Sequence, residues 1–216
     1  MREFRATPPK IQAPQIGACA PADRGISDYT DDVCDTLWRD LDGAGAAVLV
    51  RNVDAWRLEG CDFGGSLWRG VNCGDVIFDC CDFSNATFDA CGMHRVRFVR
   101  CKFTGTVWSD CFCSQVQWTD CVGDMASWDR VKCRDIRMEE SKFVRFSLHN
   151  CTLTRLGCAR NDWSGLQLSS TDLRGVDLSD TALDGISADT PSRLSGCRVS
   201  TAGAAAIARM WGIDVH

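Results

Sequence analysis

The chain has 216 residues, of which 25% are charged and 45% are apolar, and its formal net charge at pH 7 is −5. This composition is typical of a soluble folded chain, and the excess of acidic residues excludes a strongly basic nucleic-acid binder. No apolar stretch approaches 18 residues and the first residues are polar, so we expect no signal peptide, no membrane span and a location in the cytosol.

Residues 1–45 form a first region with a composition of its own. They hold four of the five prolines, which favours an extended N-terminal arm. Within this region we predict a short amphipathic helix over Ser27–Leu41, because apolar residues recur there at a spacing of four and Gly43 follows as a stop signal.

Residues 46–190 form the second region, and a five-residue period runs through it. Every fifth residue from Leu58 to Leu183 is apolar or Cys, with the sole exception of Gly123. A second series, two residues earlier in each pentad, is mostly small or β-branched. Five matches neither the period of a helix nor that of a flat strand, so each pentad is predicted to be an extended piece that ends in a turn.

The spacing of identical residues predicts how many pentads close one coil. With four pentads per coil, like residues stack on like in columns, whereas three pentads would place Cys beneath Val. Because stacked identical residues satisfy both the backbone ladder and the packing of a solenoid, a coil of 20 residues is predicted. The two columns that decide this are Cys61, Cys81, Cys101, Cys121 and Val76, Val96, Val116, Ile136.

The pentads resemble those of a known family. Triplets such as Thr171-Asp172-Leu173 and Cys81-Asp82-Phe83 are similar to the repeats of pentapeptide-repeat proteins. The resemblance covers about two thirds of the chain. It implies an all-β fold, a right-handed four-sided parallel β-helix, here followed by a short C-terminal α-helix.

The interior of this solenoid is expected to be packed with sulfur and aromatic rings. Eleven of the fifteen cysteines fall on the two inward series, where they act as small apolar residues, so we expect free thiols rather than a disulfide framework. The tryptophans of the repeat are interpreted as core residues. Gly123 leaves a hole in its column that Trp118 or Trp128 is expected to fill, unless the chain kinks there or a pocket remains.

Residues 191–216 form the third region, a C-terminal helix with two interpretations. Ser200 is predicted to cap the helix and Gly212 to end it. The helix either caps the open edge of the last coil or, as in the resembling proteins associated with DNA gyrase and quinolone resistance, joins two rods into a homodimer. The dimer hypothesis rests on Ile207, Met210 and Trp211.

The sequence contains no constellation that predicts catalysis. None of the three histidines accompanies a nucleophile motif, and there is no phosphate-binding loop or nucleotide fingerprint. Thiolates converging on one point would be needed for a zinc or copper site, and columns of parallel side chains rarely converge. We therefore predict no enzyme activity, no cofactor and no metal.

The outward residues give two indications of a partner. Outward charges almost balance over the walls, with acidic residues concentrated towards the two ends, so mimicry of duplex DNA, which the resemblance implies, is supported only in part. In contrast, a stretch near the middle of the repeat is nearly uncharged. Its outward apolar residues are predicted to contact a partner or the N-terminal arm: Val107, Phe112, Val122 and Met125.

Three functions remain open from the sequence. The first, implied by the resemblance, is a non-enzymatic rod that binds and protects or modulates a type II DNA topoisomerase, as in self-resistance to a toxin or in antibiotic resistance. The second is a scaffold or accessory protein for another partner, such as a biosynthetic enzyme. The third is a thiol-rich metal or redox protein.

Overall fold

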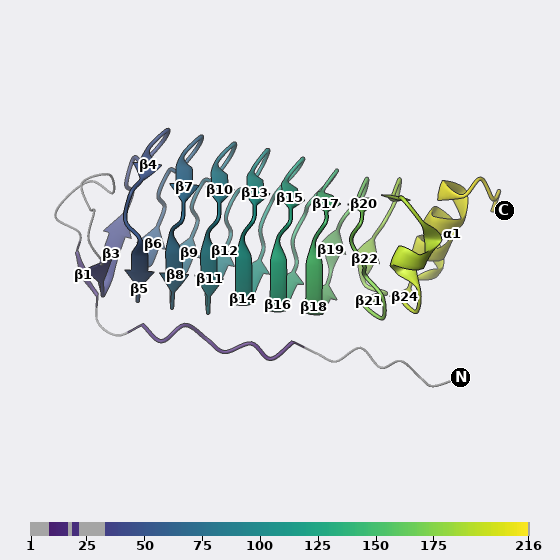
Figure 1. The fold of residues 1–216 in the computed structure, drawn as a ribbon, viewed down its shortest axis with the longest axis horizontal. Coiled ribbons are helices and arrows are strands. Elements are labelled where there is room, and N and C mark those ends of the chain that lie inside the picture. Colours follow the sequence, from purple (N-terminus) through teal and green to yellow (C-terminus); the bar gives the residue numbers. More distant parts are fainter. Residues whose placement is uncertain (1–8, 17–18, 22–32, 216) are drawn as a thin grey trace.

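The protein is a parallel β-solenoid with one short helix at its C-terminal end (Figure 1). The computed structural model describes residues 9–16, 19–21 and 33–215. Strands from successive coils pair in parallel, with an offset of 20 residues from Val33 to Ala188, as in Phe88 with Trp108 and Trp108 with Trp128. The end pairs Ala20 with Thr36 and Asp177 with Arg198 depart from this offset. The predicted fold class and coil length are therefore confirmed.

Each coil has four walls, which we number in chain order. The solenoid strands of wall 1 are β3 (Thr36–Arg39), β6 (Arg57–Glu59), β9 (Ile77–Asp79), β12 (Arg97–Val99), the second parts of β14 (Phe112–Thr119), β16 (Lys132–Glu139) and β18 (Thr152–Ala159), then β21 (Asp177–Leu178) and β24 (Arg198–Val199). Wall 2 is joined by bridges between residues 42, 62, 82, 102, 122, 142 and 162, and by β19 (Asn161–Asp162) with β22 (Thr181–Ala182).

The other two walls have the same ladder arrangement. Wall 3 consists of β4 (Ala47–Val48), β7 (Leu67–Arg69), β10 (Thr87–Asp89), β13 (Val107–Ser109), β15 (Ser127–Asp129), β17 (Ser147–His149), β20 (Gln167–Ser169) and β23 (Ser187–Ala188). Wall 4 consists of β2 (Val33–Cys34), β5 (Asn52–Asp54), β8 (Asn72–Gly74), β11 (Gly92–His94) and the first parts of β14, β16 and β18.

The corners between walls are made by residues in the left-handed region of backbone conformation. They recur every five residues, and many are not glycine: Asp75, Arg95 and Gln115 have φ values of 54°, 53° and 57°. This conformation is rare outside glycine, asparagine and aspartate. It turns the chain at the end of each extended piece, as the five-residue period predicts.

Because the register is constant, identical side chains stack along the interior. Phe78 and Phe98 stack with ring centroids 5.0 Å apart, and Phe63 and Phe83 with centroids 5.3 Å apart. The tryptophans from 56 to 163 are buried, which confirms them as core residues. Aromatic pairs of this kind stabilise a core beyond the area that they bury.

The cysteine column at the corner of walls 1 and 2 has a structural role. The thiol of Cys101 donates to the carbonyl oxygen of Phe78 and that of Cys121 to the carbonyl oxygen of Phe98, both at a distance of 3.5 Å. Further along the column, Asn161 makes the same contact through Nδ2 with the carbonyl of Met138, at 2.8 Å. The column therefore satisfies backbone acceptors, and a thiol is one of several groups that can do so.

The hole at Gly123 is filled from the next coil. A Cβ atom at Gly123 would lie 2.2 Å from Cε1 of Phe143, so the ring of Phe143 occupies the space that a side chain would need. The prediction that Trp118 or Trp128 fills it was wrong, because both rings stack within their own columns.

The N-terminal region differs from its prediction in one respect. Residues 33–41 follow the repeat as strands β2 and β3 instead of a helix, with Thr36 and Trp38 buried at the two inward positions. The prediction of a helix was wrong because it relied on apolar residues that recur every four positions. The segment also fits the five-residue repeat, with Thr36 and Trp38 as its two inward residues. Residues 27–32 of the predicted helix lie outside the described residues, and the coils begin before residue 46.

The extended arm is present in the described residues 9–16, which run along the rod outside the coils (Figure 1). The chain then forms β1 (Ala20–Pro21), which pairs with β3 beyond the first coil.

The C-terminal region follows the prediction for the helix. After the 3-10 helix η2 (Pro191–Leu194), α1 spans Thr201–Met210. The hydroxyl of Ser200 accepts a hydrogen bond from the amide of Gly203 at 3.0 Å, and Gly212 has a positive φ of 76° just beyond the end. Among the described residues, no helix has the length and apolar character needed to cross a membrane.

Candidate functional site

The four apolar residues singled out near the middle of the repeat lie on the surface, and we name them the waist patch. Val107 is on wall 3, Phe112 on wall 4 and Val122 on wall 2, while Met125 is at the corner of walls 2 and 3. Phe112 is 51% exposed and Met125 53% exposed. The patch thus runs around three walls at about the same height of the rod.

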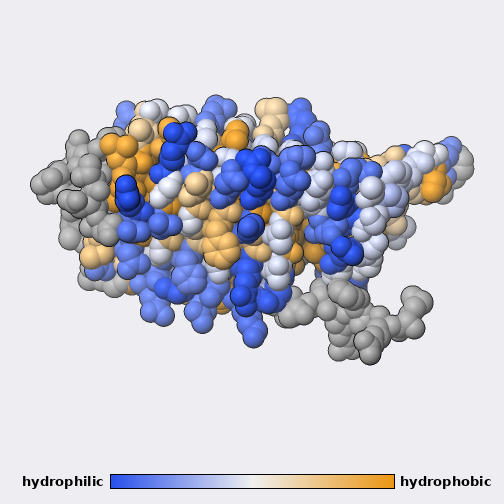
Figure 2. Space-filling model, viewed as in Figure 1, coloured by the Kyte–Doolittle hydropathy of each residue, from blue (hydrophilic) through white to orange (hydrophobic). Residues whose placement is uncertain are grey.

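The surroundings of the waist patch are mainly polar. Hydrophilic residues predominate on the face in Figure 2, with hydrophobic residues in smaller areas between them. In the ladder of wall 4, Phe112 pairs with Gly92 on one side and with Lys132 on the other. Leu49 is equally exposed but lies in the first coils, away from the patch.

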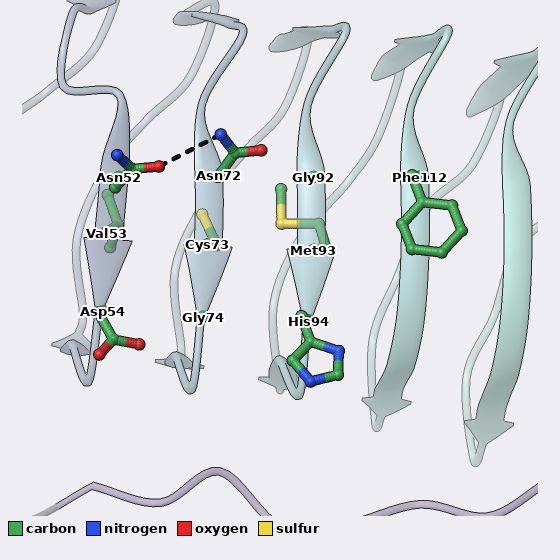
Figure 3. A pocket seen from close by; sticks show the side chains of 10 residues that line it. All are labelled: Asn52, Val53, Asp54, Asn72, Cys73, Gly74, Gly92, Met93, His94 and Phe112. Carbon is green, nitrogen blue, oxygen red and sulfur yellow. Dashed lines mark hydrogen bonds between the residues drawn. The ribbon is translucent and has the colours of Figure 1, made fainter.

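A shallow hollow of about 390 Å³ lies beside Phe112 on wall 4 (Figure 3). Gly74 and Gly92 form its floor, and the longer side chains of the preceding coil lean over them: a Cβ at Gly92 would lie 2.6 Å from Oδ1 of Asn72. Asn72 also donates through Nδ2 to Oδ1 of Asn52 at 3.3 Å. The hollow therefore offers amide groups and one aromatic ring, a surface suited to contact with a protein.

The corner between walls 4 and 1 carries buried ion pairs. Asp75 is 7% exposed and forms a bidentate pair with Arg95, with Oδ1 and Nε 2.6 Å apart. Asp135 is 5% exposed and forms the same pair with Arg155. Hydrogen bonds from Arg155 lower the pKa of Asp135 to about 2, and Arg95 lowers the pKa of Asp75. Both carboxylates are therefore ionised at neutral pH.

The N-terminal arm is bound to this corner. The backbone amide of Lys10 donates to Oδ1 of Asp135 and that of Gln15 to Oδ1 of Asp75, both at a distance of 2.9 Å. The amide of Gln12 donates to Oε1 of Gln115 at 3.2 Å. This contact was not predicted from the sequence. The signal was present as alternation of Asp, Arg and Gln at 20-residue spacing, but a repeat pattern shows only that a residue faces outward.

The C-terminal residues proposed for dimerisation fall into two groups. Ile207 and Met210 are half-buried and pack against the core of the last coils. Trp211 is exposed, together with Ile213 and Val215 beyond the helix. The helix thus covers the end of the solenoid and presents a separate apolar group to solvent.

The remaining reactive side chains do not form a site in the part of the chain that the structure describes. No group of three or more His, Cys, Asp or Glu residues there has a geometry that would hold a metal ion. Burial raises the pKa of Cys73 and Cys101, and it raises that of Cys151 to about 11. These thiols are protonated at neutral pH and hence weak nucleophiles.

Comparison with known proteins finds a family model that matches part of the repeat. Residues 71–148 match the family model described as a pentapeptide repeat region. No curated protein matches the chain.

Two solved structures have a similar fold at low sequence identity. One is full-length QnrB1, a plasmid-mediated fluoroquinolone resistance protein; it is 19% identical, the match covers 88% of this chain and 94% of QnrB1, and the TM-score is 0.42. The other is HetL, a pentapeptide repeat protein involved in heterocyst differentiation regulation in the cyanobacterium Nostoc sp. strain PCC 7120; it is 15% identical, with 82% of this chain and 88% of HetL covered and a TM-score of 0.42.

Proposed function

We propose that this pentapeptide-repeat protein is a non-catalytic, cytosolic rod that binds a type II DNA topoisomerase, such as DNA gyrase, through the waist patch. Binding would protect or modulate that enzyme, as in resistance to a drug or a toxin. The observation that carries the proposal is the exposure of Val107, Phe112, Val122 and Met125 on a surface that is otherwise mainly polar.

The waist patch has the properties of a protein contact. Exposed apolar residues scattered singly need no explanation, but a group of them at one height of a rod favours an interaction site. Phe112 is the residue best suited to dominate such a contact, because large aromatic side chains carry much of the binding energy at interfaces. Lys132 and the amides of Asn52 and Asn72 beside Phe112 supply polar groups around it.

The class of partner is taken from the resemblance of the repeats to proteins associated with DNA gyrase and quinolone resistance. We also propose that the protein is a homodimer joined end to end. Trp211, Ile213 and Val215 support this, since an exposed apolar group at the end of a rod favours a two-fold contact.

The experiment compares three forms of the protein in a gyrase supercoiling assay, with and without a fluoroquinolone. The double variant Val107→Asp with Phe112→Asp should lose at least ten-fold in potency, because two carboxylates would be desolvated at the contact. The variant Leu49→Asp, equally apolar before substitution but outside the patch, should behave as wild type. If the wild-type protein has no effect on gyrase, the proposed partner is wrong. If all three forms are equally potent, the proposal that the waist patch is the contact is wrong.

A further inference from the structure

The corner between walls 4 and 1 has a pattern of hydrogen-bond acceptors that matches the arm. From coil to coil it presents Asp75, Arg95, Gln115, Asp135 and Arg155. The first, third and fourth of these accept a backbone N–H from the arm, while the two arginines have no acceptor to offer.

The arm carries a proline near each of the two coils where the corner lacks an acceptor. The arm binds Asp75 through the amide of Gln15 and Gln115 through the amide of Gln12. Between these two contacts it passes the coil of Arg95, and this stretch contains Pro14, which has no N–H. Beyond Lys10 on Asp135 comes Pro9, whose ring lies against Gly157 in the coil of Arg155. The arm thus has two prolines five residues apart: Pro9 lies against the coil of Arg155, and Pro14 belongs to the short stretch that passes the coil of Arg95.

Gly157 provides the space for the proline ring. A Cβ atom at this position would lie 3.0 Å from Cγ of Pro9 and 3.1 Å from its Cδ, which is closer than most real contacts. The other outward residues in the same column of wall 1 include Arg97, Gln117 and Arg137. A side chain is therefore absent at the coil where the proline of the arm packs.

In the described residues 9–16, the hydrogen bonds to Asp75, Gln115 and Asp135 involve the backbone of the arm and not its side chains. Lys10, Gln12 and Gln15 have exposed side chains, and residues 9–16 form no β-ladder with the coils. A set of side-chain acceptors that contacts only N–H groups recognises any extended peptide with donors and prolines in the right places. We propose that this corner is a binding track for an extended peptide of a partner protein with two prolines five residues apart, and that the chain's own arm occupies the track until such a peptide displaces it.

The proposal goes beyond the waist patch, because it concerns a peptide ligand and its test needs no topoisomerase. The track adjoins the patch, since Phe112 lines the same hollow as Gln115 and Asp135. A tethered arm competes at an effective concentration in the millimolar range, so a free peptide at micromolar concentration binds poorly to the wild-type protein. The track becomes accessible when the arm loses its own donors.

The test uses the full chain and, as the probe, a fluorescein-labelled peptide with the sequence of residues 9–16. In the first variant, Gln12→Pro with Gln15→Pro removes two of the three donors of the arm and leaves the track intact. Its matched control, Gln12→Ala with Gln15→Ala, keeps both N–H groups and changes the same exposed side chains. Fluorescence anisotropy should show about 30-fold tighter probe binding to the first variant than to the control, at roughly five-fold for each net hydrogen bond lost.

Two further comparisons show whether the probe binds the track. Adding Gly157→Val to the proline variant should abolish the gain, because the new side chain occupies the site of the proline ring; valine is well tolerated on a strand, and circular dichroism checks that the fold is kept. A probe with both prolines moved one place towards the C-terminus, onto the positions of Lys10 and Gln15, should bind at least ten-fold more weakly. Equal binding by the proline variant and the alanine control, no effect of Gly157→Val, or equal binding of both probes would overturn the proposal.

Discussion

The contact between Gly123 and Phe143 allows a quantitative test of how the interior is packed. In Gly123→Ala the new Cβ would lie 2.2 Å from Cε1 and 2.4 Å from Cδ1 of Phe143. The ring cannot move far, because Phe146 lies 5.3 Å from it between centroids and Phe103 packs on it from the other side. Overpacking of this kind costs about 1–3 kcal/mol.

The same space predicts that a smaller residue at 143 rescues the substitution. Phe143→Leu alone should destabilise by about 1–2 kcal/mol through lost ring contacts. In the double variant the two costs should not add, because the smaller side chain makes room for the methyl group; we expect a coupling of about 1 kcal/mol or more. Phe83→Leu combined with Gly123→Ala is the control, since Phe83 lies two coils away and its effect should be additive.

The assay is urea unfolding followed by circular dichroism, with the free energy of unfolding taken from each of the single and double variants. A neutral Gly123→Ala, or additive costs for the pair with Phe143→Leu, would refute the account of this interior. Either result would mean that the Phe143 ring does not occupy the space at Gly123.

Three further predictions concern the corner, the C-terminal end and the thiols. The pKa of Asp135 is depressed to about 2 from the ordinary value near 3.9, so the stability that its ionised form contributes is present above about pH 4 and is lost as the pH falls towards 2. Over that window the urea midpoint of wild type should therefore fall more than that of Asp135→Asn. Parallel falls of the two midpoints would contradict this. Trp211→Asp with Ile213→Asp should convert a dimer to a monomer in light scattering at unchanged melting temperature, whereas Ile207→Asp should lower the melting temperature because Ile207 packs on the core. Under native conditions an alkylating reagent should label exposed Cys34 and Cys80 at once but Cys73, Cys101 and Cys113 only after unfolding, and rapid labelling of the second group would show that the interior opens.

The sequence predicted the fold because the inward positions of each pentad are constrained by packing. Coil length, the columns of cysteine and phenylalanine, and the cap at Ser200 all follow from residues whose environment repeats. The helix predicted over Ser27–Leu41 was wrong in its described part for a related reason, since a few apolar residues near Trp38 fit both a helical and a five-residue spacing.

The surfaces were only partly predictable from the sequence. Outward apolar residues such as Phe112 stand out in a polar series, so the waist patch could be named in advance. The track could not, because Asp75 and Asp135 occur in the sequence as ordinary outward residues, and the amides that they bind belong to an arm 60 and 125 residues away in the chain. The role of Gly157 likewise depends on what lies over it.

The most direct test of the proposed function is site-specific crosslinking to a purified topoisomerase. A photoreactive phenylalanine analogue placed at Phe112 should crosslink to a gyrase subunit on irradiation, whereas the same analogue at Leu49 should not, since both positions are exposed but only the first belongs to the waist patch. Addition of unlabelled wild-type rod should reduce the crosslink at 112. Absence of a crosslink at 112, or equal crosslinking at 49, would contradict the proposal that this patch binds the enzyme.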